Sequence, residues 1–388
     1  MQAKELAHEF SASFGGQPAI FSAPGRVNLI GEHTDYNDGF VMPCAIGFNT
    51  RMAISPREDR QLVIQSKQFP EIVRFDLNNL PDRGSGAWFD YVVGVAVILQ
   101  QQGLPLKGGN LFVDGEVPIG AGLSSSAAIE VASALALTSI AATKLPMEEI
   151  AKLCQRSENT FIGARVGIMD QFVSCLGKEG HALFLDCRSL AFKLIPIPAE
   201  VRLVISNTMV KHQHAGGEYN RRREECEEGV RVLSQWHPGI RALRDVSIDQ
   251  LIKHEQDISE IIFRRCRHVV EENARVCDGA RLLRIGDLQG FGELMEESHR
   301  SLRDLYEVSC RELNIMVEAA EGLPGYYGAR MTGGGFGGCT INLVEATCAE
   351  AFASEISDRY LRATEIKPAV YICSAAEGAR QESETPAI

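Results

Sequence analysis

The chain has 388 residues, of which 45% are hydrophobic and 23% are charged, as is usual for a soluble globular protein. A single hydrophobic core usually stops growing below this length, so the chain is long enough for two domains. The net charge of −12 argues against a protein that binds nucleic acid without regard to sequence. An anionic ligand such as a nucleotide would have to be held by local positive groups.

The 11 cysteines are odd in number, scattered along the chain and never arranged as Cys-x-x-Cys. This usage favours reduced thiols in a cytoplasmic protein over a disulfide framework or a zinc site. The first residues predict an amphipathic helix and contain no signal-peptide core. The longest uncharged apolar run, at residues 91–99, is too short to cross a bilayer. We therefore expect a cytoplasmic protein that does not associate with membranes.

The first half of the chain alternates predicted strands and helices. Strands are predicted at residues 19–22, 51–55, 62–66, 72–75 and 110–117. Helices are predicted at residues 88–102, 127–142 and 146–161. Between the first two strands, residues 23–39 predict a polar loop, with a turn at Pro24 and Gly25.

The second half begins after Pro196 and Pro198, which mark the expected boundary between domains of residues 1–198 and 199–388. Strands are predicted at residues 201–207, 341–344 and 369–373. Helices are predicted at residues 218–236, 258–284 and 287–320, with breaks in the last near Gly290 and Gly292. The expected fold class is α+β with two domains.

A glycine-rich turn, Pro-Ile-Gly-Ala-Gly-Leu-Ser-Ser-Ser-Ala-Ala at residues 118–128, connects a predicted strand to a predicted helix. Backbone N–H groups and the positive end of the helix dipole converge at such a turn, which favours an anion such as phosphate. The serines stand where capping side chains belong, and their hydroxyls can also bind a ligand or a metal. An ordinary capped helix is the simpler alternative. The turn lacks the Gly-x4-Gly-Lys-Ser/Thr pattern, so it is not a P-loop.

A polar segment at residues 25–36 reads Gly-Arg-Val-Asn-Leu-Ile-Gly-Glu-His-Thr-Asp-Tyr. Glu32 and Asp35 would share one face if this segment were helical. With His33 they offer several acceptors to a ligand that carries hydroxyl groups. A solvated loop is the alternative, and it explains the apolar residues 27–30 poorly.

Further candidates lie later in the chain. Glu158 lies near the end of the helix predicted at residues 146–161, and Asp170 lies in an apolar setting between Met169 and Phe172. We interpret them as a metal ligand and a base, although buried structural Asp residues are common. His212 and His214 are better explained as surface histidines than as a metal pair. Residues 221–225 predict an ion-paired helix face.

A run of glycines at residues 333–338 formally matches Gly-x-Gly-x-x-Gly. A strand is predicted after it, where a dinucleotide-binding fold would have a helix. The pattern therefore rejects that fold and indicates a backbone pressed against a ligand or against another loop.

Three of these stretches, at residues 25–36, 118–128 and 332–338, resemble in order the signature motifs of the GHMP small-molecule kinases. With Gly-Ile-Met-Asp-Gln at residues 167–171 and Glu-Tyr-Asn-x-Arg-Arg at residues 218–223, they resemble the galactokinase family specifically. The resemblance runs over nearly the whole chain. It implies an N-terminal and a C-terminal domain with the active site in the cleft between them.

The resemblance implies transfer of a phosphoryl group from ATP to the C1 hydroxyl of galactose, the first committed step of galactose use by the Leloir pathway. It implies Asp170 as the base, with Arg26 beside it. The implied galactose contacts are Glu32, His33, Thr34, Asp35, Gly167 and Tyr219. The implied ATP contacts are Gly120, Ala121, Gly122, Leu123, Ser124, Ser125 and Ser126 for the phosphates, with Ser66, Trp88 and Tyr91 near the base. Ser126 and Glu158 are implied as ligands of Mg²⁺.

Two alternatives stay open: a kinase of the same family for another sugar, such as N-acetylgalactosamine or arabinose, and a sensor that binds sugar and ATP without catalysis. The complete sets at residues 32–35 and 124–127, with Arg26 and Asp170, favour a catalytic galactokinase. Asp38 departs from the family pattern, and residues 164–166 lie where the family varies. The resemblance therefore does not define the wall of the sugar pocket. The expected partners are galactose and Mg-ATP, with no nucleic acid, in a monomer or weak homo-oligomer.

Overall fold

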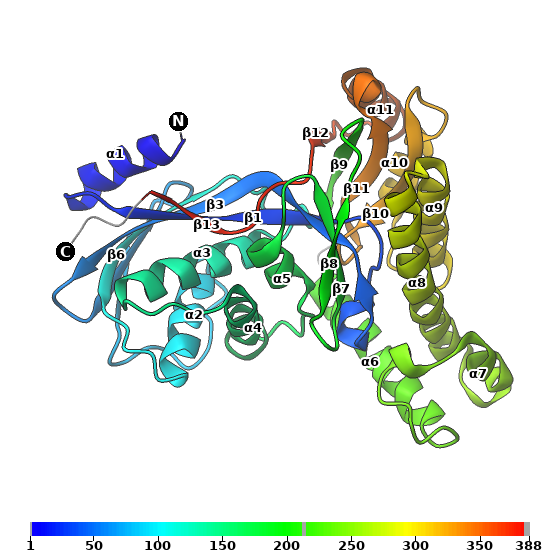
Figure 1. The fold of residues 1–388 in the computed structure, drawn as a ribbon, viewed down its shortest axis with the longest axis horizontal. Helices are drawn as coiled ribbons and strands as arrows, with labels where there is room; N and C mark the ends of the chain where they lie inside the picture. Colours follow the sequence, from blue (N-terminus) through cyan, green and yellow to red (C-terminus); the bar gives the residue numbers. More distant parts are fainter. Residues whose placement is uncertain (1, 212–214, 384–388) are drawn as a thin grey trace.

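The computed structural model describes residues 2–211 and 215–383. The molecule is elongated, with one sheet and its helices at one end and a helix-rich half at the other (Figure 1). The strands are β1 Ala19–Asn28, β2 Phe40–Val41, β3 Pro43–Arg57, β4 Gln61–Ser66, β5 Val73–Asp76, β6 Gly108–Gly115, β7 His181–Asp186, β8 Phe192–Pro196, β9 Val201–Lys211, β10 Tyr326–Thr332, β11 Gly337–Glu345, β12 Ala369–Cys373 and β13 Arg380–Ser383. The helices are α1 Gln2–Phe14, α2 Asp90–Gln101, α3 Ser125–Ile140, α4 Met147–Ser157, α5 Met169–Leu176, α6 Ala215–Leu233, α7 Ile248–Lys253, α8 Glu260–Ile285, α9 Leu288–Asp304, α10 Arg311–Ala320 and α11 Ala349–Thr364. The α+β class is confirmed.

The described strands form three sheets, in the orders β13-β1-β3-β6-β4-β5, β10-β11-β9-β12 and β2-β7-β8. In the first sheet, alternate residues of each strand face opposite sides. Phe21 and Met52 face the core under α2 to α5, whereas Ile20 and Ala53 pack against α1. Figure 1 shows α1 alone on its side of this sheet and α2 to α5 on the other.

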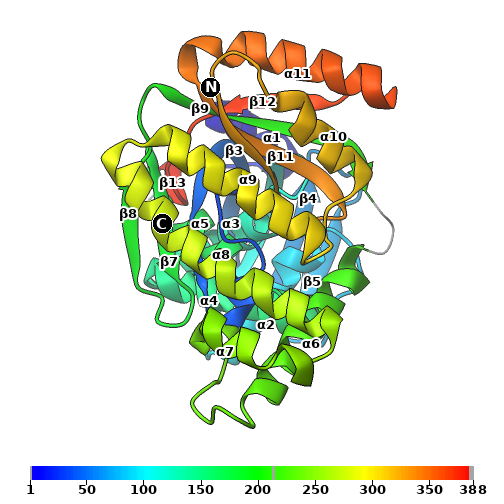
Figure 2. The same ribbon diagram turned by 90° about the vertical axis from the view of Figure 1, so that its right-hand side faces the viewer.

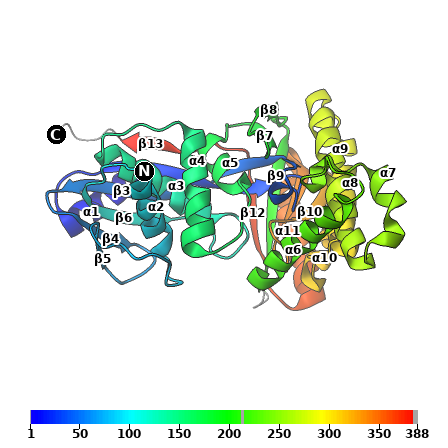
Figure 3. The same cartoon turned by 90° about the horizontal axis from the view of Figure 1, so that it is seen from below.

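The second sheet is covered on both faces. Apolar residues of α10 and α11 pack on one face, and residues of α8 and α9 pack on the other (Figure 2). The latter core also contains Val27 of β1 and Val117 and Leu123, which precede α3. A single apolar cluster thus connects the two halves of the molecule, which lie along its length in Figure 3.

The C-terminal strand β13 pairs with β1, so the end of the chain returns to the first sheet. The division into domains of residues 1–198 and 199–388 stays a prediction. Among the helices of the described residues, none combines the length and the apolar character that a bilayer span requires.

The predicted turn at Pro24 and Gly25 is wrong, because both residues lie inside β1. The register between β1 and β3 shifts between Pro24 and Arg26, so the irregularity is absorbed within the strand. A Cβ atom on Gly25 would lie 2.6 Å from the Leu123 carbonyl oxygen. Glycine is therefore needed where β1 passes the 116–124 loop. The next residue, Arg26, donates a hydrogen bond of 3.0 Å from its backbone N–H to the Leu123 carbonyl oxygen of this loop.

The predicted breaks near Gly290 and Gly292 are also wrong, since α9 continues through both residues. A Cβ atom on Gly292 would lie 1.8 Å from the Tyr327 carbonyl oxygen, so this glycine serves the close packing of α9 on β10. The break in the helical segment falls instead between Asp304 and Arg311.

We predict that Gly25→Ala destabilises the protein, because its Cβ must displace the 116–124 loop or the Val117 side chain, which it would approach to 2.9 Å. The expected loss in the free energy of unfolding is about 1–3 kcal/mol, as for overpacked cores. Urea unfolding measures it. Gly47→Ala in β3 is the control, since no atom lies within 4 Å of a Cβ there. Equal stability of the two variants would contradict the prediction.

Candidate active site

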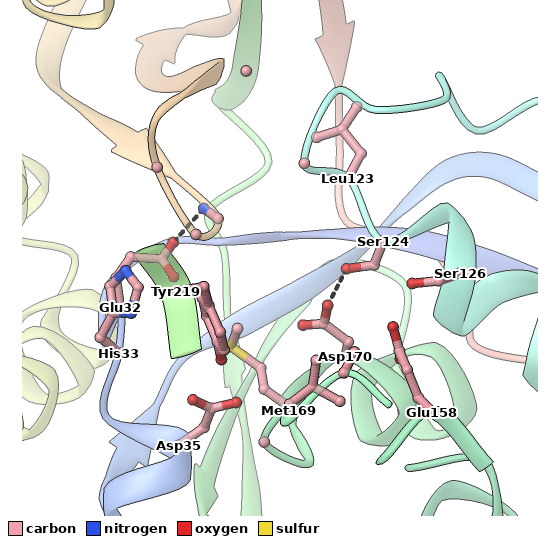
Figure 4. Close-up of a pocket in the computed structure, with 18 of the residues that line it drawn as sticks. Glu32, His33, Asp35, Leu123, Ser124, Ser126, Glu158, Met169, Asp170 and Tyr219 are labelled. Carbon is pink, nitrogen blue, oxygen red and sulfur yellow. Dashed lines mark hydrogen bonds between the residues drawn. The ribbon is translucent and has the colours of Figure 1, made fainter. Parts of the chain in front are cut away.

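A cavity of about 610 Å³ lies where the ends of β1, β10 and β11 meet the 116–124 loop and the start of α5. Figure 4 shows side chains from both halves of the molecule pointing into it. The predicted site residues that line it are Arg26, Glu32, His33, Asp35, Gly120, Gly122, Leu123, Ser124, Ser125, Ser126, Glu158, Gly167, Asp170 and Tyr219. The glycine run from Gly333 to Gly338 also lines it. Segments far apart in the sequence are thus gathered at one place.

Arg26 and Asp170 form a two-pronged ion pair at the wall of the cavity. Arg26 Nε donates to Asp170 Oδ1 at 2.8 Å, and Nη2 donates to Oδ2 at 2.9 Å. The remaining Arg26 nitrogen, Nη1, donates to the Gly122 carbonyl oxygen at 2.7 Å. The guanidinium is buried in β1, and Asp170 lies in the first turn of α5. A bidentate pair of this kind fixes both the distance and the plane of the carboxylate.

Ser124 is the residue that precedes α3, and it adopts a left-handed conformation with φ of 59°. The expectation that its hydroxyl caps the helix is wrong, because Ser124 Oγ instead donates to Asp170 Oδ2 at 2.5 Å. Figure 4 shows this contact across the cavity wall. Gly120 and Gly122 also have positive φ, which lets the loop bend back to the start of α3. The first-turn N–H groups of α3, which have no partner within a helix, lie at this bend.

Glu158 follows α4 in a short π-helical turn, where a helix end was predicted. Its carboxylate faces Ser126 in Figure 4 and accepts a hydrogen bond of 2.6 Å from Gln171 Nε2. Burial and the nearby charge of Asp170 raise the pKa of Glu158 to about 7, although hydrogen bonds from Ser126 and Gln171 oppose the shift. Glu158 is thus a buried carboxylate that faces the Ser126 hydroxyl.

A second carboxyl group near Glu158, that of Glu130, is fully buried. Gln171 Nε2 also donates to Glu130 Oε2 at 3.2 Å, so one amide connects the two acidic side chains. Burial raises the pKa of Glu130 well above its usual value. No cluster of three or more His, Cys, Asp or Glu side chains suited to a metal occurs in the described residues.

The 29–39 loop follows β1 and carries Glu32. Its carboxylate oxygen Oε1 accepts a hydrogen bond of 2.8 Å from the Gly333 N–H, shown dashed in Figure 4. Arg330 Nη1 and Thr332 Oγ1 each lie 3.3 Å from the same atom. The glycine run is thus pressed against another loop, as the sequence allowed. Gly335 must be glycine, because its Cβ would lie 2.3 Å from the Val308 carbonyl oxygen.

Asp35 begins a short 3₁₀ turn that ends at Asn37. Only this turn of the loop is helical, so Glu32 and Asp35 do not share a helical face. The Asp35 carboxylate occupies the space beside Gly167, where a Cβ would lie 1.9 Å from Asp35 Oδ2. Burial, and then the charge of Asp170, raise the pKa of Asp35 to about 7. Gly167 therefore makes room for this acid.

His33 lies in a cluster of aromatic rings. Its ring centroid is 4.7 Å from that of Tyr306 and 5.6 Å from that of Tyr219. His33 Nδ1 and Tyr36 Oη are 2.8 Å apart, as are Tyr36 Oη and Tyr306 Oη. Burial lowers the pKa of His33 well below 6.5, so the ring is neutral. The sequence analysis missed Tyr36 and Tyr306, and Tyr306 has no local signal because it lies in the break after α9.

The structure does not bring every predicted residue to the cavity. Those that do not line it are Thr34, Ser66, Trp88, Tyr91 and Ala121. The Thr34 hydroxyl is buried, with its oxygen 2.6 Å from the Phe40 carbonyl oxygen and 2.9 Å from that of Gly31, so its one hydrogen is taken up within the loop and its flank. Trp88 stacks on Phe69 with ring centroids 5.3 Å apart. The roles of these residues toward a nucleotide stay predictions.

Two other predictions concern charged residues. Arg221 pairs with Glu225 at 3.2 Å and Arg223 with Glu227 at 3.0 Å, which confirms the ion-paired face of α6. Arg222 between them is buried and donates to the Tyr306 carbonyl oxygen at 2.7 Å. His212 and His214 lie outside the described residues.

Comparisons with known proteins agree with the motifs. Three family models match the chain: the galactokinase galactose-binding signature at residues 8–56, the GHMP kinases N terminal domain at residues 90–178 and the GHMP kinases C terminal domain at residues 280–361. The chain is 45% identical to the galactokinase of Roseiflexus sp. (strain RS-1), over 96% of both chains. It is also 45% identical to the galactokinase of Chloroflexus aurantiacus, over 95% of both chains.

The structure is similar to that of Lactococcus lactis galactokinase complexed with galactose, with a TM-score of 0.94 and 34% identity. The match covers 98% of this chain and 100% of that chain. A mevalonate kinase, at 20% identity and a TM-score of 0.64, shares the fold alone. On these similarities, the chain belongs to the galactokinase family of the GHMP kinases.

Proposed function

We propose that this protein transfers the γ-phosphoryl group of ATP to the C1 hydroxyl of galactose, giving galactose 1-phosphate and ADP. One observation carries the proposal: the Arg26–Asp170 pair lies between the acidic 29–39 loop and the start of α3, within one cavity. A hydroxyl held by the loop and a phosphate held at the helix would meet beside Asp170. The relatives named as galactokinases, one of them described in complex with galactose, support the choice of substrate.

Asp170 is suited to accept the proton of the attacking hydroxyl. A carboxylate offers about four acceptor positions. Arg26 and Ser124 occupy three of them, which leaves about one for the substrate. As the oxygen at C1 bonds to the γ-phosphorus, the bond from that phosphorus to the β-phosphate oxygen of ADP breaks. The hydroxyl proton passes to Asp170 and then to solvent.

Arg26 would serve both partners of the reaction. It neutralises the Asp170 charge and stands next to the loop that approaches the phosphates, where it can stabilise charge that develops on the phosphoryl group. Glu32, Asp35 and the neutral His33 supply the polar groups that orient the sugar, and Tyr219 lies between the acidic loop and Asp170 (Figure 4). Orientation of this kind is the main demand of phosphoryl transfer.

The residues present fit Mg²⁺, which takes oxygen ligands and keeps several waters. Ser126 and Glu158 would hold it, and Gln171 orients the Glu158 carboxylate. The ion, when bound, would neutralise phosphate charge. We place the adenine base outside the cavity, toward Ser66, Trp88 and Tyr91.

The two alternatives make different predictions. A kinase for another sugar would share the Asp170 chemistry and differ at the pocket wall, where residues 162–167 line the cavity. A sensor would have no need of the Arg26–Asp170–Ser124 arrangement, which is complete here. We propose a catalytic monomer or weak homo-oligomer, in the cytoplasm, where its cysteines stay free thiols.

The test is ADP release with Mg-ATP and galactose, glucose, N-acetylgalactosamine, arabinose or mevalonate. We expect turnover with galactose only. Turnover with a different sugar alone would keep the mechanism and overturn the substrate. Binding of galactose with no turnover across the panel would support the sensor.

Asp170→Asn should lower kcat with galactose by roughly 10² or more, because the variant loses the general base. Galactose and ATP should still bind, which calorimetry measures. Asp358→Asn, an exposed change on α11, is the matched control and should leave kcat unchanged. Near-normal turnover of Asp170→Asn would remove this carboxylate from the mechanism.

Ser126→Ala should raise the Mg²⁺ concentration needed for half-maximal activity by about tenfold, the low end for a lost interaction at a metal. Ser139→Ala, at the other end of α3, is the control, since its hydroxyl donates only to the Ala136 carbonyl oxygen at 2.7 Å. Identical Mg²⁺ titrations for the two variants would exclude Ser126 as a ligand.

Asp35→Asn should stabilise the free protein at high pH while weakening galactose binding. The pKa of Asp35 is raised to about 7 in the fold, from about 3.9 in an unfolded chain. The wild type therefore loses stability as pH rises from 4 to 7, whereas the variant carries no such charge. The melting temperature of the variant relative to wild type should rise by ~2 °C or more between pH 5 and pH 8. A difference that is independent of pH would contradict the account.

A further inference from the structure

Helix α8 presents a polar face to the underside of the 29–39 loop. Four residues spaced along one side of α8 lie against this loop and its junction with β2. They are His268, Glu272, Asn273 and Val276. The helix lies across the second half in Figure 2, and none of its residues is among those that line the cavity. The family models match residues 90–178 and 280–361, so this part of α8 lies between the matched segments.

Glu272 is the centre of this face, and its side chain is fully buried. Its Oε1 atom accepts hydrogen bonds from the Gly31 N–H at 2.9 Å and from Ser298 Oγ at 2.7 Å, with the Glu32 N–H at 3.4 Å. Its Oε2 atom pairs with Arg275 Nε at 2.7 Å. Burial acts to raise the pKa of Glu272, but Arg275 and other positive groups lower it to about 2, so the carboxylate stays ionised.

The neighbours of Glu272 hold the same loop by its backbone. His268 Nε2 lies 3.2 Å from the Glu32 carbonyl oxygen. Asn273 Oδ1 accepts at 2.8 Å from the N–H of Phe40, the first residue of β2 directly after the loop. A Cβ on Gly31 would come within 2.8 Å of Val276 Cγ2. Since α8 binds the loop through main-chain atoms, the side chains of the loop are free to point into the cavity.

Glu32 is therefore fixed from two directions. Its backbone N–H and carbonyl face Glu272 and His268 of α8. Its carboxylate is bound by the Gly333 N–H and by Arg330, which is fully buried. A shift of the backbone at Glu32 would change where the carboxylate meets a ligand.

We propose that Glu272 is a positioning residue for the sugar: it holds the backbone of Gly31 and Glu32 so that the Glu32 carboxylate meets the sugar hydroxyls in a single orientation. The inference rests on the proposed function only in taking a sugar as the ligand of Glu32. It assigns to α8 a role in galactose affinity and none in ATP binding.

The test is galactose and ATP binding by calorimetry with Glu272→Gln. An amide in this place turns an N–H₂ group toward either the two loop N–H groups or Arg275, so it weakens the clamp. We expect the Kd for galactose to rise by about tenfold and the Kd for ATP to change by less than about twofold. Glu271→Gln, the adjacent and more exposed carboxylate on α8, is the matched control and should change neither.

A double-mutant cycle with Glu32→Gln separates positioning from a general loss of structure. If Glu272 acts through Glu32, its substitution should weaken galactose binding much less in the Glu32→Gln background than in the wild type. The proposal would be overturned if the double variant raised the galactose Kd by the product of the two single-variant factors, because the two residues would then act independently. An equal loss of ATP and galactose affinity in Glu272→Gln would also overturn it. Ser298→Ala, which removes one hydrogen bond to the same oxygen, should weaken galactose binding about threefold and serves if Glu272→Gln does not fold.

These outcomes are distinct from failure of the proposed function. If the protein binds galactose but does not phosphorylate it, the effect of Glu272→Gln can still be measured as a change in the Kd for galactose. An unchanged galactose Kd in both Glu272→Gln and Ser298→Ala would overturn the positioning role even if the protein is an active galactokinase.

Discussion

The Arg26–Asp170 ion pair is the contact on which the site depends. It connects β1 to the start of α5, and through Gly122 and Ser124 it also fixes the 116–124 loop. The strand irregularity after Pro24 brings β1 close to that loop. The carboxylate proposed as the base, the guanidinium that neutralises it and the loop proposed to bind phosphate are therefore positioned by one set of hydrogen bonds.

The second half of the molecule completes the cavity. The glycine run after β10 binds Glu32, and α6 supplies Tyr219. The apolar cluster shared by β1, β9, β11 and α9 connects the second half of the molecule to the first. Two acids near Asp170, the half-buried Asp35 and the buried Glu158, have raised pKa values.

Sequence reasoning predicted the α+β class, most elements of the first half and the residues of the cavity that lie within short motifs. It failed where tertiary packing overrides local preference, as at Pro24, Gly25 and Gly292, which serve close packing inside a strand and a helix. It could not find Tyr306, Arg330 or Glu272, because their contacts join the 29–39 loop to residues more than 200 positions away. No local pattern marks such partners.

The most direct test of the account is the identity of the phosphorylated atom. Galactose labelled with ¹³C at C1 should be incubated with Mg-ATP and the protein and followed by ¹³C and ³¹P NMR. The account predicts that the labelled carbon gains a coupling to phosphorus while ADP accumulates. Phosphorus on another carbon, or release of inorganic phosphate with the labelled carbon unchanged, would contradict the placing of the C1 hydroxyl beside Asp170.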